Sequence, residues 1–359
     1  MDKILTVVIP TYNMEKLLDK CLTSLIINDA ELMKQLEVIV VIDGSKDRSS
    51  EIAHNYELEY PDTFRVIDKE NGNYGSCINR GLKEATGKYI KVLDADDTFD
   101  TLAFERYLNE IKNLDVDLVI NNYSIVNEYG QYISKHDRKL DPNVRYEQRE
   151  ILPYLTQAYL AMHEVAYKVT LLRDNNYVQT EGVSYTDQEW VLFPVAWAKS
   201  ATFIRENIYL YLIGREGQTV SANAAYKNIT HFEVRILNTI KLYNTFQDID
   251  EQSAQYLWKR IISETERVYL RYLYMGRNYL DTIGLYKFDQ DLKRLNIGIY
   301  SALDGEKLLG FIPFYYIKIW RSGENNKLRM YNPLIDVLLY YKNINFKLKS
   351  LFARTFKKK

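Results

Sequence analysis

Short runs of β-branched and other apolar residues alternate with helical patterns in the first third of the chain. The apolar runs lie at residues 5–9, 37–42, 64–68, 89–93 and 116–121. Between them, apolar residues recur at helical spacing in segments such as 17–26, 76–85 and 102–113. Strands that are apolar on both faces are typical of a parallel sheet covered by helices on each side. The sequence therefore predicts an α/β fold with a mostly parallel sheet flanked by helices.

The remainder of the chain has a different character. Residues 123–149 are polar and predict a loop or small hairpin, residues 151–172 look helical, and residues 201–204 and 209–213 look like strands. Long helical patterns follow at residues 232–246 and 256–274. A chain of 359 residues is long enough for two domains. We therefore expect a first domain over residues 1–222 and a mainly helical second domain over residues 223–359.

Three aspartates directly follow the fourth apolar run: Asp94, Asp96 and Asp97. Carboxylates this close repel one another, and a cation bound between them offsets that repulsion. Their hard oxygen atoms suit Mg²⁺ or Mn²⁺, which often complete their shells with phosphate oxygens and water. The alternative is an acidic turn in which Asp97 or Thr98 is the N-cap of the next helix. Both interpretations fit this stretch when it is taken alone.

Polar residues also follow the other predicted strands. Such segments are Pro10-Thr11-Tyr12-Asn13, Asp43-Gly44-Ser45 and the turn-rich loop from Asn71 to Gly75. In a parallel sheet these strand ends meet at one edge, which is where nucleotides bind in many α/β proteins. The first strand lacks a glycine-rich turn, so the sequence excludes a dinucleotide site of the dehydrogenase type.

Charge and cysteine content narrow the class of protein. The net charge is −1, so nothing in the overall balance suggests binding to nucleic acid. Cys21 and Cys77 lie among apolar helix residues, which indicates buried thiols, a reducing cytoplasm and neither a disulfide framework nor a zinc cluster. We expect no signal peptide and no membrane-spanning segment.

The last segment, Pro333 to Lys359, alternates apolar clusters with basic residues, and seven basic residues follow Asp336. This pattern fits a helix that lies on an anionic membrane surface, which would place the protein at the inner face of the cell membrane. A contact in a homo-oligomer or a frayed basic tail are the alternatives.

Several motifs occur in a fixed order. They are IPTYN, VIVVIDGSKDRS, NGNYGSCINRGLKEATGKYIKVLDADD and TDQEW. Together they closely resemble the family 2 glycosyltransferases of the GT-A fold, of the type that builds bacterial surface glycans. The resemblance covers residues 3–221 and implies a Rossmann-like domain that binds a nucleotide sugar.

The resemblance assigns roles around the nucleotide. Thr11 and Tyr12, after Pro10, match residues beside the nucleobase and ribose, where an aromatic face can stack on uracil. Asp43 matches the carboxylate that accepts a hydrogen bond from the base, which favours uridine; the family usually has a second acid where this chain has Ile42. The loop and helix start that close over the nucleotide match Asn71, Gly72, Gly75 and Asn79.

The resemblance also assigns the chemistry. Asp94 and Asp96, separated by Ala95, match the DxD pair, with Asp96 as the direct metal ligand and Asp94 nearer the ribose or the metal-bound waters. Asp187 matches the catalytic base, although Thr186 replaces the glutamate that usually precedes it. Glu189 is the alternative base, or a charge on a helix surface.

Three further residues have both a functional and a structural interpretation. Arg215 resembles the arginine of a loop that folds over the diphosphate, or it is a solvated arginine. His163, on the helix predicted before Tyr167, can touch the acceptor or phosphate, or be structural. Trp190 can be an acceptor platform or a core residue.

The sequence therefore predicts a metal-dependent, inverting glycosyltransferase that uses Mn²⁺ or Mg²⁺. It would move a hexose from a UDP-sugar to a hydroxyl of a glycan, glycoprotein or lipid-linked acceptor. Two alternatives are a catalytically silent glycan-binding scaffold, which need not keep Asp96 and Asp187, and a sugar-nucleotide pyrophosphorylase. The latter would need a glycine-rich basic loop after its first strand, where this chain has PTYN.

Overall fold

The computed structural model describes residues 2–214, 228–246, 248–275, 282–308, 312 and 314–324. The chain forms two compact units. One consists of Met1–Glu216 and Glu251–Tyr256, and the other of Gly217–Asp250 and Leu257–Lys359. The division into domains at residue 222 stays a prediction.

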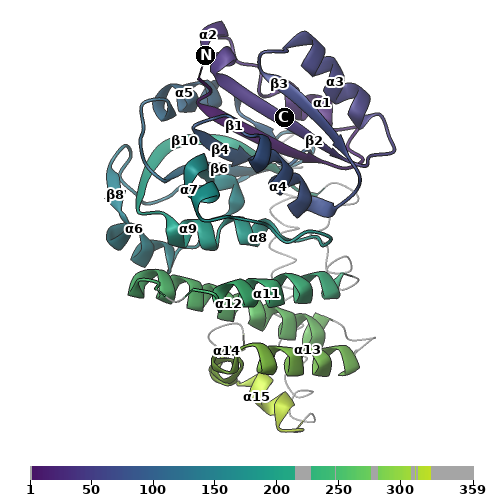
Figure 1. Cartoon of the computed structure of the whole chain (residues 1–359), viewed down its shortest axis with the longest axis vertical. Coiled ribbons are helices and arrows are strands. Elements are labelled where there is room, and N and C mark those ends of the chain that lie inside the picture. The colour runs from purple at the N-terminus through teal and green to yellow at the C-terminus, as the bar shows by residue number, and fades with distance from the viewer. Residues whose placement is uncertain are drawn as a thin grey trace, which may run out of the picture. The chain divides into compact units, whose positions relative to one another are not determined.

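A ten-stranded sheet forms the centre of the first unit (Figure 1). Its order is β3-β2-β1-β4-β9-β6-β10-β5, with β7 beside β6 and β8 beside β10. Strands β1 to β4 pair in parallel, as do β6 and β10, whereas β9 runs antiparallel to both β4 and β6. The predicted α/β fold with a mostly parallel sheet is confirmed. The strands are β1 (Leu5–Thr11), β2 (Leu36–Asp43), β3 (Phe64–Lys69), β4 (Tyr89–Val92), β5 (Thr98–Phe99), β6 (Leu118–Val126), β7 (Tyr132–His136), β8 (Arg145–Glu147), β9 (Val165–Lys168) and β10 (Ser200–Leu212).

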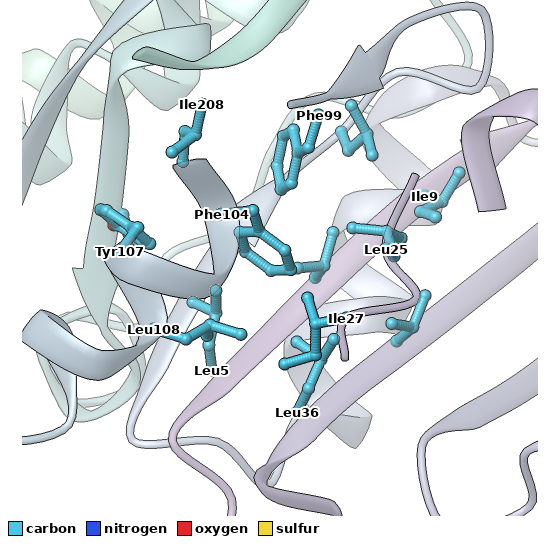
Figure 2. Packing of buried hydrophobic residues seen from close by; sticks show 14 of the residues in the cluster. Leu5, Ile9, Leu25, Ile27, Leu36, Phe99, Phe104, Tyr107, Leu108 and Ile208 are labelled. Carbon is cyan, nitrogen blue, oxygen red and sulfur yellow. The ribbon is translucent and has the colours of Figure 1, made fainter. Parts of the chain in front are cut away.

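Helices cover both faces of the parallel part of the sheet. Alternate residues of a strand point to opposite faces. Leu5 and Ile9 of β1 join one buried cluster with Phe104 of α5 (Figure 2). Val8 points to the opposite face of β1, toward α4. A Cβ added at Gly81 of α4 would lie 2.4 Å from Cγ1 of Val8. The helices of this unit are α1 (Leu18–Thr23), α2 (Ala30–Gln35), α3 (Ser49–Glu59), α4 (Asn73–Glu84), α5 (Thr101–Ile111), α6 (Gln148–Leu155), α7 (Val169–Asp174), α8 (Asp187–Trp190) and α9 (Phe193–Trp197), with a 3₁₀ turn η1 (Met162–Glu164).

The prediction of one helix over residues 151–172 is wrong in the middle of that range, whereas residues 151–155 and 169–172 are helical. Helix α6 ends at Leu155, and residues 165–168 instead form β9, which fills the space between β4 and β6. Val165, Ala166 and Tyr167 are buried there on both faces, so strand pairing outweighs their local helical spacing. The hairpin expected within residues 123–149 is present as β6 and β7, and the two short strands expected after residue 200 are one strand, β10.

The second unit is helical in its described part, as predicted. Its centre includes a buried ion pair in which Nη2 of Arg235 lies 2.8 Å from Oε2 of Glu264. Helix α12 begins in residues of the first unit. The described elements are α11 (Ile229–Tyr243), α12 (Glu251–Leu270), a π-helical turn η2 (Arg271–Met275), α13 (Thr282–Leu295), α14 (Ile297–Ala302), a 3₁₀ turn η3 (Leu303–Gly305) and α15 (Tyr316–Arg321).

Within the described ranges, none of the helices combines the length and the apolar character that crossing a bilayer would need. The basic segment 333–359 lies outside the described residues.

Candidate active site

The parallel register of the sheet brings the predicted strand ends together. Thr11 at the end of β1 pairs with Ile42 on β2, and Asp43 pairs with Lys69 on β3. On the other side of β1, Val8 pairs with Val92, the last residue of β4. The segments that follow β1, β2, β3 and β4 therefore leave the sheet along one edge.

The acidic cluster lies at this edge, directly after β4. A turn closed by the amide of Asp97 on the carbonyl of Asp94 (2.9 Å) gathers the three side chains. Carboxylate oxygens of Asp94, Asp96 and Asp97 lie within 4.8 Å of one another. Three hard oxygen donors at this spacing fit a divalent cation such as Mg²⁺ or Mn²⁺.

Asp97 is not the N-cap of the next helix, which corrects that prediction. Asp100 caps α5, because its Oδ1 accepts a hydrogen bond from the amide of Ala103 (2.9 Å). The buried carboxylate of Asp97 instead accepts hydrogen bonds from the hydroxyl of Tyr209 and the amide of Leu212, both at 2.7 Å. Burial and the neighbouring carboxylates raise the pKa of Asp97 well above its usual range. The three carboxylates therefore repel one another when ionised, and a bound cation would offset that repulsion.

Two tyrosines orient Asp94. The hydroxyl of Tyr74, on α4, donates a hydrogen bond to Oδ1 of Asp94 (2.7 Å). The hydroxyl of Tyr209 accepts one from the backbone amide of Asp94 (3.2 Å). Burial, and after it the charge of Asp94, raises the pKa of Tyr74 well above its usual range, so this phenol stays protonated and acts as a donor.

The side of the site that is predicted to hold the nucleobase is built around Asp43. Its buried Oδ1 accepts hydrogen bonds from Nζ of Lys69 (2.6 Å) and the amide of Gly72 (2.9 Å). The Asn71 side chain donates to the backbone carbonyl of Asp43 (2.9 Å). Tyr12, which directly follows β1 at this edge, is 46% exposed. Thr11, by contrast, is buried.

Gly75 and Asn79 make a contact in the structure that the sequence did not predict. They hold the segment at residues 179–181. A Cβ on Gly75 would lie 2.0 Å from the carbonyl oxygen of Thr180, so only glycine permits this approach. The side-chain amide of Asn79 donates a hydrogen bond to the backbone carbonyl of Gln179 (2.9 Å), and its oxygen accepts one from the backbone amide of Gln179 (2.8 Å). A contact of Asn79 with the nucleotide stays a prediction.

Asp187 opens α8 at the end of this segment. Its Oδ2 accepts a hydrogen bond from the side chain of Gln188 (2.8 Å). Burial, then the cluster carboxylates, and then Asp187 raise the pKa of Tyr211. Asp187 is therefore close enough to Tyr211 to add to this shift, and its role as the catalytic base stays a prediction.

Glu189, the alternative base, is held by the protein. It is buried, and its two oxygens accept hydrogen bonds from the amide and the hydroxyl of Thr180, both at 2.7 Å. The interpretation of Glu189 as a charge on a helix surface is wrong. Thr186, which stands where relatives of the resembled family have glutamate, is also buried and accepts hydrogen bonds from Gln179.

Comparison with known proteins agrees with this geometry. Residues 6–174 match the family described as Glycosyl transferase family 2. EpsJ of Bacillus subtilis, an uncharacterised glycosyltransferase, is 26% identical over 260 residues, which are 68% of this chain and 71% of EpsJ. The chain is a glycosyltransferase, with a family 2 match over residues 6–174. A poly(ribitol-phosphate) beta-glucosyltransferase of Bacillus spizizenii is 29% identical over 220 residues, and the match covers 60% of this chain but only 33% of that enzyme.

A solved structure supports the fold of this glycosyltransferase. S. aureus TarS, residues 1–349, in complex with UDP-GlcNAc, superposes with a TM-score of 0.58 at 21% identity. The match covers 81% of this chain and 80% of that one. The predicted GT-A architecture is thereby confirmed.

Of the three residues with two interpretations, Trp190 is structural in the glycosyltransferase, and a contact of His163 with the acceptor or phosphate stays a prediction. His163 lies in the turn η1, and burial lowers its pKa to about 3, so the ring is neutral. Trp190 is buried against Tyr167 and Tyr177, which corrects the idea of an acceptor platform. Arg215 lies outside the described residues.

Sequence reasoning missed four residues of this edge. They are Lys69, Tyr74, Tyr209 and Tyr211. The two tyrosines on β10 are two positions apart and so point to the same face of the strand, a signal that the sequence carried. Lys69 pairs in register with Asp43 at the ends of neighbouring strands, which alignment of the strand ends would have shown.

Proposed function

We propose that this glycosyltransferase moves a hexose from a UDP-sugar to a hydroxyl of a glycan acceptor, with a divalent metal and with inversion at the anomeric carbon. The observation that carries the proposal is the cluster of Asp94, Asp96 and Asp97 at the carboxyl end of β4. A metal site beside a candidate base is what sugar transfer from a diphosphate donor needs.

Asp96 and Asp94 would hold the metal, as the sequence predicts, and Asp97 adds a third carboxylate beside them. A bound Mg²⁺ or Mn²⁺ would offset the charge of the donor's diphosphate. Tyr74 keeps Asp94 in one orientation, and Tyr209 does the same for Asp97. The protein's part is thus to hold these oxygens in place before the substrate arrives.

Uracil is the proposed nucleobase of the donor. Asp43 keeps one carboxylate oxygen on Lys69 and Gly72, while the nearby ring of Tyr12 offers a surface for stacking. The TarS structure with UDP-GlcNAc supports this choice, since that protein of the same fold binds a uridine diphosphate sugar.

In the proposed reaction the carboxylate of Asp187 removes the proton from the acceptor hydroxyl. The acceptor oxygen forms a bond to the anomeric carbon while the bond from that carbon to the diphosphate oxygen breaks. UDP leaves with the bonding electrons, and attack from the opposite side inverts the configuration. Glu189 cannot take this role without giving up its two hydrogen bonds to Thr180.

For the acceptor we propose a bacterial surface glycan, free or carried on a lipid or a protein. The name of the Bacillus spizizenii relative, a beta-glucosyltransferase of poly(ribitol phosphate), supports a polymer with free hydroxyls. The same proposal includes a contact of segment 333–359 with the inner face of the cell membrane or with a second copy of the chain.

Calorimetric titration of UDP, GDP and TDP, with and without Mn²⁺, tests the donor half. We expect UDP to bind more tightly than GDP or TDP and to need the metal for binding. We expect no UDP binding to Asp96→Asn. Asp100→Asn is the matched control, because asparagine keeps the N-cap of α5 and the residue lies outside the cluster. Absence of nucleotide binding to the unmodified protein would contradict the proposal and favour a glycan-binding scaffold.

A further inference from the structure

The side chain of Tyr211 lies beside the acidic cluster without being one of its members. Tyr211 is two residues after Tyr209 on β10, so both rings are on the same face of the strand. The hydroxyl of Tyr209 donates a hydrogen bond to the carboxylate of Asp97. The backbone amide of Leu212, the residue after Tyr211, donates another to the same carboxylate. These two contacts fix β10 against the turn that carries the cluster.

The ring of Tyr211 has a firm support. The ring of His163 stacks on it with centroids 4.6 Å apart and planes 27° apart. His163 also packs on Tyr209, with ring centroids 4.5 Å apart, and is itself half-buried and neutral. A phenol held in this way needs little ordering when a ligand binds.

The hydroxyl of Tyr211 is free to act on a ligand. The residue is half-buried, and no hydrogen bond joins this hydroxyl to another residue in the described part of the chain. Burial, together with the charges of Asp97, Asp94 and Asp96 and then Asp187, raises its pKa, so it remains a hydrogen-bond donor. This donor shares a face of β10 with Tyr209, whose hydroxyl contacts Asp97, and the charges of the cluster and of Asp187 act on it.

We propose that the hydroxyl of Tyr211 donates a hydrogen bond to an oxygen of the β-phosphate of the bound nucleotide sugar. This inference rests on the proposed function and names one contact within it. Negative charge grows on the β-phosphate as UDP leaves, and a fixed donor aimed at that charge favours the transition state over the ground state. The phenol keeps its proton throughout, and the acceptor's proton goes to Asp187.

Binding of UDP and UMP to Tyr211→Phe, in the presence of Mn²⁺, tests the contact. UMP has no β-phosphate, so loss of the hydroxyl should weaken UDP about 10- to 100-fold and leave UMP unchanged. Tyr123→Phe is the matched control, because this ring also packs on His163 while the charges that act on its hydroxyl are those of Glu164 and Arg138 and not those of the cluster. We expect the control to bind both nucleotides as the unmodified protein does.

Two results would overturn the assignment while the proposed function stands. They are unchanged UDP binding by Tyr211→Phe and an equal loss of UDP and UMP binding, which would show a general disturbance of the site. Thermal unfolding of the variant checks the second case. If the unmodified protein shows no metal-dependent UDP binding, the proposed function fails, and this inference fails with it.

Discussion

The hydroxyl of Tyr74 lies 2.7 Å from Oδ1 of Asp94 and 3.3 Å from Sδ of Met162. Burial keeps the phenol protonated, so its hydroxyl holds one oxygen of the Asp94 carboxylate in place. Partners of metal ligands orient those ligands, and their loss commonly weakens metal binding about 10- to 100-fold. This relationship makes the proposed metal site testable through a residue that does not bind the metal.

We therefore expect Tyr74→Phe to weaken Mn²⁺ binding about 10-fold or more, measured by electron paramagnetic resonance of free Mn²⁺. Tyr56→Phe is the control, because it removes a hydroxyl that bonds a carboxylate, Asp19, elsewhere in the same unit (2.9 Å). Equal Mn²⁺ affinity in Tyr74→Phe and in the control would count against a metal on Asp94.

Asp187 and Glu189 should separate in their effects on catalysis and stability. Asp187→Asn removes the proposed base, so we expect turnover of the UDP-sugar to fall about 10²- to 10⁴-fold with UDP affinity unchanged. Glu189→Gln leaves the amide or hydroxyl of Thr180 without its acceptor, which should lower the free energy of unfolding by about 1–3 kcal/mol.

Steady-state kinetics and urea unfolding of the two variants make this comparison. A Glu189→Gln protein of normal stability that lacks turnover, beside an active Asp187→Asn protein, would reverse the assignment of the base.

Much of the donor edge was predictable because it depends on strand ends. The apolar runs before Asp43 and Asp94 are short and clearly bounded, and a parallel sheet leaves such ends no other place to meet. The role of Asp97 was not predictable in this way. Its partners, Tyr209 and Leu212, are more than 100 positions away in the sequence, and a local rule for helix caps selected the wrong function.

The same limit explains β9 and Glu189. Residues 165–168 have an acceptable helical pattern, but a gap between β4 and β6 makes them a strand. Glu189 looks like a surface charge until the segment at Thr180 folds back beside it. Each of these features is decided by a neighbour in space, which periodicity and composition do not contain.

Gly75 supports a prediction about the link between α4 and the segment that leads to Asp187. A methyl group at this position would lie 2.0 Å from the carbonyl oxygen and 2.9 Å from the carbonyl carbon of Thr180, and both are backbone atoms. Gly75→Ala must therefore push the segment away. We expect a loss of about 1–3 kcal/mol in the free energy of unfolding, measured with urea, together with lower turnover.

Gly305→Ala is the control for this change, because a Cβ at Gly305 would meet no atom within 4 Å. If Gly75→Ala is as stable and as active as Gly305→Ala, the close packing of α4 on Thr180 does not position the proposed catalytic base, Asp187.

His54 should give the protein a small stability term that depends on pH. Its Nδ1 lies 2.8 Å from Oε2 of Glu57, and its Nε2 lies 2.8 Å from Oδ2 of Asp68. The hydrogen bond to Asp68, more than that to Glu57, raises the pKa of His54 above its usual value. A raised pKa means that the folded protein binds the proton more tightly than the unfolded chain. The stabilisation is therefore complete below about pH 6.5 and disappears as the pH rises through the folded pKa.

The side chain of His54 is 43% exposed, so solvent screening limits this contribution to about 1 kcal/mol or less. Urea unfolding of the unmodified protein and of His54→Gln, from pH 5.5 to 8.5, isolates it as a difference, since other titrating groups are common to both proteins. We expect the unmodified protein to have its advantage at the acidic end and to lose it at the alkaline end. A difference that stays constant over this range, or that grows with pH, would show that the two carboxylates do not hold the imidazolium.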